Sequence, residues 1–229
     1  MDHYIEHISI SLPDQKNNEI SYGLAFKLAA ARLADAAFLE AQCPNSGSDC
    51  LEAGSNKIIT LSYFNEPYQI AWPEISVSRP GSQEKVELRD QILILHYLTH
   101  AAGTPLSGQL ITYQEFREGA VYFPSFFKRA VKPLIDHFGP QPDRLVEAAA
   151  SLGGITASFG DISVNIPAFQ RVPVILVLWR GDDEFPPNGN ILFDSTVLDY
   201  LSPEDINILC QTIVWKLISL LRKSGSAIH

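Results

Sequence analysis

The chain has 229 residues, and 46% of them are hydrophobic, which is enough to bury a full core without disulfides or a structural metal. Its formal net charge is −9, and a surface of that sign repels phosphate backbones, so we exclude nucleic acid as a partner. No apolar stretch approaches the roughly 20 residues of a membrane span, so we expect no association with a membrane.

The N-terminal part is predicted to contain one helix and a small antiparallel sheet. Residues 20–41 are rich in Ala and Leu, and their apolar positions fall on one stripe of Ile20, Leu24, Leu28 and Ala31. Residues 43–54 are small and polar, which predicts a loop. The β-rich runs 58–64 and 68–72 are separated by a short turn that contains proline, which predicts a hairpin, and residues 75–78 add a third strand.

The middle of the chain is predicted to be mostly helical. Residues 88–101 form a helix that is apolar nearly all round, so we expect it at the centre of the fold. Residues 110–113 form a short strand. Pro124 opens another helix, kinked at Pro133, with an apolar face of Phe126, Phe127, Ala130, Val131, Leu134 and Phe138. Asp143 caps a shorter helix that ends at Gly153 and Gly154.

The last part is predicted to contain three strands and a long helix. Residues 162–166 alternate as a half-buried strand does, residues 172–179 are continuously apolar, and residues 191–193 form a shorter strand. The final helix begins with Ser202 as its cap, followed by Pro203, Glu204 and Asp205. Its buried stripe consists of Ile206, Leu209, Ile213, Leu217 and Leu220.

These elements predict an α+β fold rather than a doubly wound sheet, because helices come first and last and no βαβ alternation runs through the chain. We expect mostly antiparallel strands packed against a buried central helix and the C-terminal helix. No linker divides the sequence, so residues 1–229 are taken as a single domain. Within it, residues 1–80 hold the N-terminal helix and hairpin, and residues 87–220 form the second portion.

The first candidate site is an acidic turn that follows the most buried strand. Residues 180–187 contain three consecutive carboxylates, which repel each other unless something neutralises them, and magnesium and calcium prefer such oxygen ligands. Because strands 162–166 and 172–179 have a short connection, they pair antiparallel and place Asp161 near the turn. We predict a cluster of Asp161, Asp182, Asp183, Glu184 and Asp194, with Arg180 alongside. The alternative is an ordinary turn in which Arg180 pairs with Asp161 and Asp194 caps a helix.

The second candidate site is the pair His96 and His100, which share one face of a predicted helix at a spacing common among metal ligands. They are candidate ligands of a metal or a tetrapyrrole. The alternative is that His96 is a core histidine whose hydrogen bonds are satisfied within the protein.

An aromatic group supplies a candidate pocket wall for a flat ligand, formed by Tyr113, Phe116 and Tyr122. Its alternative is ordinary core packing.

The cysteines and the N-terminus bear on the compartment. Cys43, Cys50 and Cys210 are odd in number and lack close pairing, which argues against a disulfide framework. The first 13 residues lack the basic start and apolar block of a secretory signal. We therefore expect a cytoplasmic protein in which Cys43 and Cys50 are ordinary loop thiols and Cys210 is a small core residue.

The second portion of the chain resembles a known family. The motifs that carry the likeness are Leu95 to Leu98, Thr104 to Gly108, Thr112 to Phe116, Gly119, Tyr122, Gly160, Asp161, Pro173 to Trp179, Asp182 to Pro186, and Leu192 to Asp194. Over residues 87–220 the chain is similar to the uncharacterised bacterial and archaeal proteins known as domain of unknown function 3786. The resemblance implies a setting in anaerobes, where some members join this domain to a four-cysteine iron–sulfur module used in corrinoid-dependent one-carbon metabolism. This chain has no four-cysteine motif.

From these observations we expect a binding or accessory protein for a divalent metal or a tetrapyrrole, of the corrinoid or haem kind, in anaerobic metabolism. A small ligand or a partner protein is compatible with this expectation. One alternative is a carboxylate-dependent metal enzyme that acts on a small molecule. Another is a protein-interaction domain without a small ligand.

Overall fold

The structure is a computed structural model that describes residues 13–226. The segment before Pro13, on which the expectation about a secretory signal rests, lies outside the described residues. Within residues 13–226, none of the helices has the length and apolar content that crossing a membrane requires.

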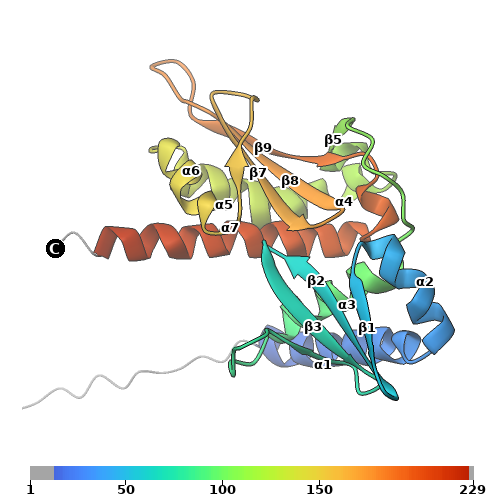
Figure 1. Ribbon diagram of the computed structural model, residues 1–229. Helices are drawn as coiled ribbons and strands as arrows, with labels where there is room; N and C mark the ends of the chain where they lie inside the picture. The colour runs from blue at the N-terminus through green and yellow to red at the C-terminus, as the bar shows by residue number, and fades with distance from the viewer. Residues whose placement is uncertain (1–12, 227–229) are drawn as a thin grey trace, which may run out of the picture.

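The elements gather on two sides of the long C-terminal helix α7 (Pro203–Ser226), which runs between them (Figure 1). On one side lie α1 (Pro13–Leu33), α2 (Ala36–Ser46), β1 (Asp49–Ala53), β2 (Asn56–Tyr63), β3 (Glu66–Trp72), β4 (Ser76–Ser78) and α3 (Leu88–His100). On the other lie β5 (Leu110–Thr112), η1 (Tyr113–Glu115), α4 (Gly119–Phe126), η2 (Phe127–Val131), α5 (Lys132–Phe138), α6 (Asp143–Ala150), β6 (Ile155–Thr156), β7 (Ile162–Phe169), β8 (Val172–Trp179), β9 (Asn188–Asp194) and η3 (Val197–Asp199).

The strands confirm the predicted α+β class. Among the described residues they form a nine-stranded sheet in the order β4-β3-β2-β7-β8-β9-β5, with β1 beside β2 and β6 beside β7. Every pairing between these strands is antiparallel. In the part of the chain that the structure describes, the two halves of the sheet meet at the end of β2, where Tyr63 pairs with Phe169 and the Phe64 N–H donates to the Ala168 carbonyl.

Two predictions about the N-terminal part are wrong. The single helix predicted over residues 20–41 is interrupted at Asp35, whose carboxylate accepts hydrogen bonds from the N–H groups of Ala37 and Phe38 and so caps a new helix, α2. The predicted loop over residues 43–54 is the end of α2 followed by β1, which forms a hairpin with β2. Leu24 and Leu28 are exposed, because α1 buries Ala29 and Leu33 instead.

The helix predicted to open at Pro124 begins earlier, at Gly119, and continues through α4, η2 and α5 to Phe138. The segment η2 is a turn of π-helix that ends at Val131, two residues before Pro133. A proline clashes with the carbonyl four residues earlier, and the wider π turn relieves that clash. Asp143 is the first residue of α6 and not its cap, which is Pro142.

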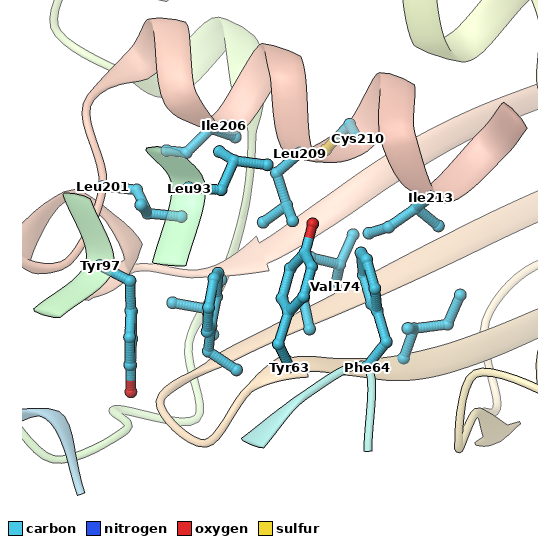
Figure 2. Packing of buried hydrophobic residues seen from close by; sticks show 14 of the residues in the cluster. Tyr63, Phe64, Leu93, Tyr97, Val174, Leu201, Ile206, Leu209, Cys210 and Ile213 are labelled. Atoms are coloured by element: carbon cyan, nitrogen blue, oxygen red, sulfur yellow. The ribbon is translucent and has the colours of Figure 1, made fainter. Parts of the chain in front are cut away.

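Helix α3 is buried, as predicted, and α7 packs on the same core (Figure 2). Tyr63 and Phe64 extend from the end of β2 toward α7, while Val174 approaches from β8. Tyr97 of α3 stacks on Phe169, with ring centroids 4.2 Å apart, and its hydroxyl donates to the Ser46 carbonyl at 2.6 Å. Aromatic contacts therefore fill the place where the two halves of the sheet meet.

A buried carboxylate connects α3, β2 and α7. Asp90 is only 5% exposed, and it accepts a hydrogen bond of 3.0 Å from the Tyr63 hydroxyl and one of 3.1 Å from the Lys216 ammonium. Burial raises the pKa of Tyr63 well above its usual value, and the nearby Asp90 raises it further, so this hydroxyl stays a donor. The Lys216 ammonium also lies 5.5 Å from the centroid of the Phe64 ring.

Cys43 and Cys50 form a disulfide, which corrects the expectation of two loop thiols. The bond joins the last turn of α2 to β1, and the two Cα atoms are 6.2 Å apart. The predicted core position of Cys210 is confirmed, since this thiol is buried.

Replacing Tyr63 with phenylalanine should lower the free energy of unfolding by about 2 kcal/mol, because it removes a hydrogen bond to a buried charged group. Urea denaturation measures the change. The exposed Tyr122 offers the matched control, and Tyr122→Phe should alter stability by less than about 0.5 kcal/mol. Equal effects of the two changes would contradict the role given to Asp90.

Reduction of the Cys43–Cys50 bond should also lower stability. For two cysteines separated by seven positions, the loss of chain constraint in the unfolded state corresponds to about 2 kcal/mol. Thermal denaturation with and without dithiothreitol measures the effect in the full chain. A double variant, Cys43→Ser with Cys50→Ser, should melt at the same temperature in both conditions, whereas an unchanged wild-type melting temperature would show that the bond does not form in solution.

Candidate functional site

The acidic end of the sheet has part of the geometry that the sequence predicts. Ile162 pairs with Leu178, so Asp161 lies beside the end of β8. The Asp161 carboxylate accepts a hydrogen bond of 2.8 Å from the Arg180 main-chain N–H. The Arg180 guanidinium turns away from Asp161 and forms an ion pair of 2.9 Å with Asp143. The Arg180 guanidinium thus neutralises Asp143, a residue outside the predicted cluster.

The carboxylates of the turn itself serve mainly to shape it. Asp182 accepts hydrogen bonds from the N–H groups of Phe185 and Glu184, and these bonds lower its pKa. Asp183 and Glu184 are exposed at the tip. Across residues 13–226, the structure brings together no group of three or more His, Cys, Asp or Glu side chains that could hold a metal ion. The arrangement therefore matches a structural turn more closely than a metal centre.

Asp194 lies at the opposite end of the sheet, so its predicted place in the cluster is wrong. Strand β9 runs antiparallel to β8, and Trp179 at the acidic end pairs with Asn188, at the start of β9. The strand therefore carries its last residue, Asp194, away from the turn. There Asp194 accepts hydrogen bonds from the main-chain N–H groups of Ser107, Gly108 and Thr196 at 2.8 to 3.1 Å.

The candidate pocket wall lies elsewhere, at the start of α7. Tyr113 and Tyr122 line a pocket of about 390 Å³, whereas Phe116 is buried in the core beside Tyr113. The Tyr113 hydroxyl donates to the Pro203 carbonyl at 3.1 Å, and burial raises the pKa of this tyrosine to about 12. Gly119 allows the start of α4 to lie close to the main chain at Tyr113, since a Cβ there would lie 1.8 Å from the Tyr113 carbonyl oxygen.

Sequence reasoning missed the polar part of this pocket, which consists of Glu118, Ser125, Arg129, Ser202, Glu204 and Asn207. These residues come from α4 and the residue before it, from η2, and from the cap and first turns of α7. Their spacing in the sequence carries no signal that joins them. Asn207 is 8% exposed, and among the described residues its Oδ1 atom has no hydrogen-bond partner.

The predicted histidine pair lies on the other side of the first turn of α7. The Nδ1 atom of His96 is 2.7 Å from Oδ1 of Asp205, which is nearly buried. Burial acts to raise the pKa of Asp205, but the hydrogen bonds from His96 and Ser202 outweigh it and lower that pKa. An ionised carboxylate accepts, so Nδ1 of His96 carries a proton, and the lone pair of the neutral ring lies on Nε2.

Ser202 extends this chain of hydrogen bonds. Its hydroxyl donates to Oδ2 of Asp205 at 2.6 Å and accepts from the Asp205 N–H at 3.1 Å. This reciprocal arrangement caps α7, as the sequence predicts for Ser202. The cap of α7 thus also fixes the carboxylate that orients His96.

His100 lies next to His96, with ring centroids 5.5 Å apart. Burial is the main cause that lowers the pKa of His100, and the neighbouring His96 adds to it. A lowered pKa keeps the His100 ring neutral near pH 7, which is the form that binds metals.

Exchange of Asp194 for asparagine should destabilise the fold and change its response to acid. Burial opposes ionisation of Asp194, but the N–H groups of Thr196, Ser107 and Gly108 outweigh it and lower the pKa to about 2. Because this pKa lies below the unfolded value, the carboxylate stabilises the protein above about pH 4, and that contribution disappears as the pH falls toward 2. Asp194→Asn should lower the free energy of unfolding by about 2 kcal/mol at pH 7. In acid, the stability of this variant should depend less on pH than that of the wild type. Asp183→Asn, at the exposed turn, is the control and should follow the wild-type profile.

Comparison with known proteins agrees with the resemblance seen in the sequence. Residues 40–216 match the family described as Domain of unknown function (DUF3786). The match begins before residue 87, so it includes α2 from its middle and all of β1 to β4. No curated protein and no solved structure matches the chain. Because the matched region covers more than half of the 229 residues, the chain belongs to the DUF3786 family.

Proposed function

We propose that this protein binds a metal-containing ligand through His96 and His100, as a binding or accessory protein. The observation that carries the proposal is the hydrogen bond of 2.7 Å between His96 Nδ1 and the nearly buried Asp205 carboxylate. Histidines that ligate metals commonly donate their other ring N–H to a carboxylate, which fixes the tautomer and raises the basicity of the ligating nitrogen. Asp205 and Ser202 supply this support to His96.

The number of protein ligands favours a metal that already carries ligands of its own. Structural zinc sites have four protein ligands and catalytic zinc sites have three, whereas this face of α3 offers two imidazoles. A tetrapyrrole supplies four nitrogens and leaves axial positions that a histidine can fill. The site therefore suits a tetrapyrrole or another chelated divalent metal better than a bare ion.

The setting of this activity is also a proposal. We place it in the cytoplasm on the cysteine count and the N-terminal sequence, and in anaerobic metabolism, as the family resemblance implies. The Cys43–Cys50 bond weighs against a reducing compartment, so the thiol content of protein purified without air from its own host tests the location directly.

The two alternatives have less support. A carboxylate-dependent metal enzyme needs its acids exposed in a cleft with an open coordination position, but Asp161 and Asp182 accept main-chain hydrogen bonds and Asp194 lies at the other end of the sheet. In a protein-interaction domain without a small ligand, the His96–Asp205 bond serves only to join α3 to α7.

The test is a titration of the full chain with haemin, hydroxocobalamin and Ni²⁺, followed by absorption spectroscopy. We expect at least one of these probes to produce a ligation spectrum that is lost in the double variant His96→Ala with His100→Ala. Asp205→Asn should weaken binding by about 10- to 100-fold, because the carboxylate orients the ligating ring. Ser202→Ala, which removes the same cap, shows how much of any change follows from lost stability.

His137 provides the matched histidine control. Its Nδ1 lies 2.9 Å from the Pro133 carbonyl, and its ring contacts Trp215, so His137→Ala should leave binding unchanged. A probe that binds the double variant as tightly as the wild type would remove this site from consideration. The absorption spectrum and metal content of protein from its own host identify which probe resembles the natural ligand.

A further inference from the structure

The pocket at the start of α7 has a buried inner part and a partly apolar lining. Tyr113 and Asn207, which are 1% and 8% exposed, line its inner part, while Tyr122, which is 52% exposed, lies nearer the solvent. The volume of about 390 Å³ lies within the range of about 300 to 1,000 Å³ that small-molecule sites occupy. The pocket therefore has the size and the mixed lining of a site for a small ligand.

The charged residues of this pocket have both signs, and the protein does not pair them. Arg129 belongs to η2, Glu118 directly precedes α4, and Glu204 lies in the first turn of α7. Within residues 13–226, none of these three side chains forms an ion pair. A ligand that carries one positive and one negative group can therefore pair with both kinds of charge in the same pocket.

The amide of Asn207 is a second, independent observation that points to a ligand. Its side chain lines the pocket, yet among the described residues its Oδ1 atom has no hydrogen-bond partner. A buried acceptor without a donor is unfavourable, and an N–H group supplied by a ligand removes that cost. Asn207 therefore favours a ligand with an N–H donor over one that carries acceptors alone.

We propose that this pocket binds a free α-amino acid with an apolar side chain. The carboxylate of the amino acid pairs with Arg129, because the planar guanidinium matches a carboxylate in a bidentate geometry. Its ammonium group pairs with Glu118 and Glu204 and supplies the donor that Asn207 lacks. Its apolar side chain packs against the ring of Tyr122.

The pocket is separate from the histidine site, although both involve the first turn of α7. Asp205 contacts His96 on one side of this turn, whereas Glu204 and Asn207 line the pocket on the other. The proposal therefore does not depend on metal binding by the histidines. The double variant His96→Ala with His100→Ala should bind the amino acid as tightly as the wild type does.

The test is isothermal titration of the full chain with L-phenylalanine and L-leucine, at least one of which should bind. The matching amine without a carboxylate is phenethylamine or 3-methylbutylamine, and the matching acid without an ammonium group is 3-phenylpropanoate or 4-methylpentanoate. Each analogue should bind more weakly than its amino acid by about 10-fold or more, because it loses a charged contact. The proposal fails if neither amino acid binds, or if either analogue binds as tightly as its amino acid.

Variants assign the two charges to their partners. Arg129→Gln should weaken binding of the amino acid by about 10- to 100-fold and leave the affinity for the amine analogue unchanged. Glu118→Gln with Glu204→Gln should weaken it similarly and spare the acid analogue. Lys128→Gln is the matched control, because Lys128 is the exposed cation next to Arg129 on η2 but lies outside the pocket lining. Melting temperatures verify folding, and an Arg129→Gln variant that binds like the wild type would overturn the proposal.

Discussion

The buried carboxylate of Asp90 is the interaction on which much of the fold depends. A charge so fully removed from water is stable only when hydrogen-bonded donors surround it, and here the donors come from β2 and α7. Among the described residues, the two halves of the sheet share the Tyr63–Phe169 pairing and the hydrogen bond from Phe64 to Ala168. Their relative position must therefore be fixed by side chains, and Asp90 links Tyr63, at that junction, to the helix that both halves pack against. The stacked rings of Tyr97 and Phe169 fill the remaining space.

Helix α7 has a second role, because its first turn organises the chemistry of the chain. Ser202 and Asp205 cap the helix, and the same Asp205 carboxylate orients His96 of α3. Pro203, Glu204 and Asn207 face the pocket of Tyr113 and Tyr122. Further along, Trp215 and Lys216 line another pocket. One long helix between the two halves thus presents different polar groups to different neighbours, which explains why a mostly apolar helix also carries the candidate sites.

The acidic end of the sheet shows how far local reasoning reaches. The short connection between β7 and β8 was enough to place Asp161 beside Arg180, since a tight turn permits only antiparallel pairing. Because β9 is also antiparallel to β8, Asp194 lies at the opposite end of these strands from the acidic turn. The ion-pair partner of Arg180 could not be predicted from the sequence, because Asp143 belongs to a helix that is not joined to this turn by a short connection. Gly54 and Ser55 did carry a hairpin signal for β1 and β2, and Asp35 carried a cap signal for α2.

The sequence by itself determined the α+β class, the strands β7 and β8, the buried helix α3 and the start of α7, because period, apolar runs and capping residues act within a few positions of one another. It also determined that His96 and His100 share a face. Only the tertiary structure decided that Asp205, 109 positions away, holds His96, that Cys43 meets Cys50, and that Arg79, Arg89 and Lys216 surround one pocket. Those contacts depend on how the helices and the sheet pack in space. The free energy that selects them comes from burial and charge pairing between distant segments. Such pairings produce no periodic pattern in the sequence from which they could be predicted.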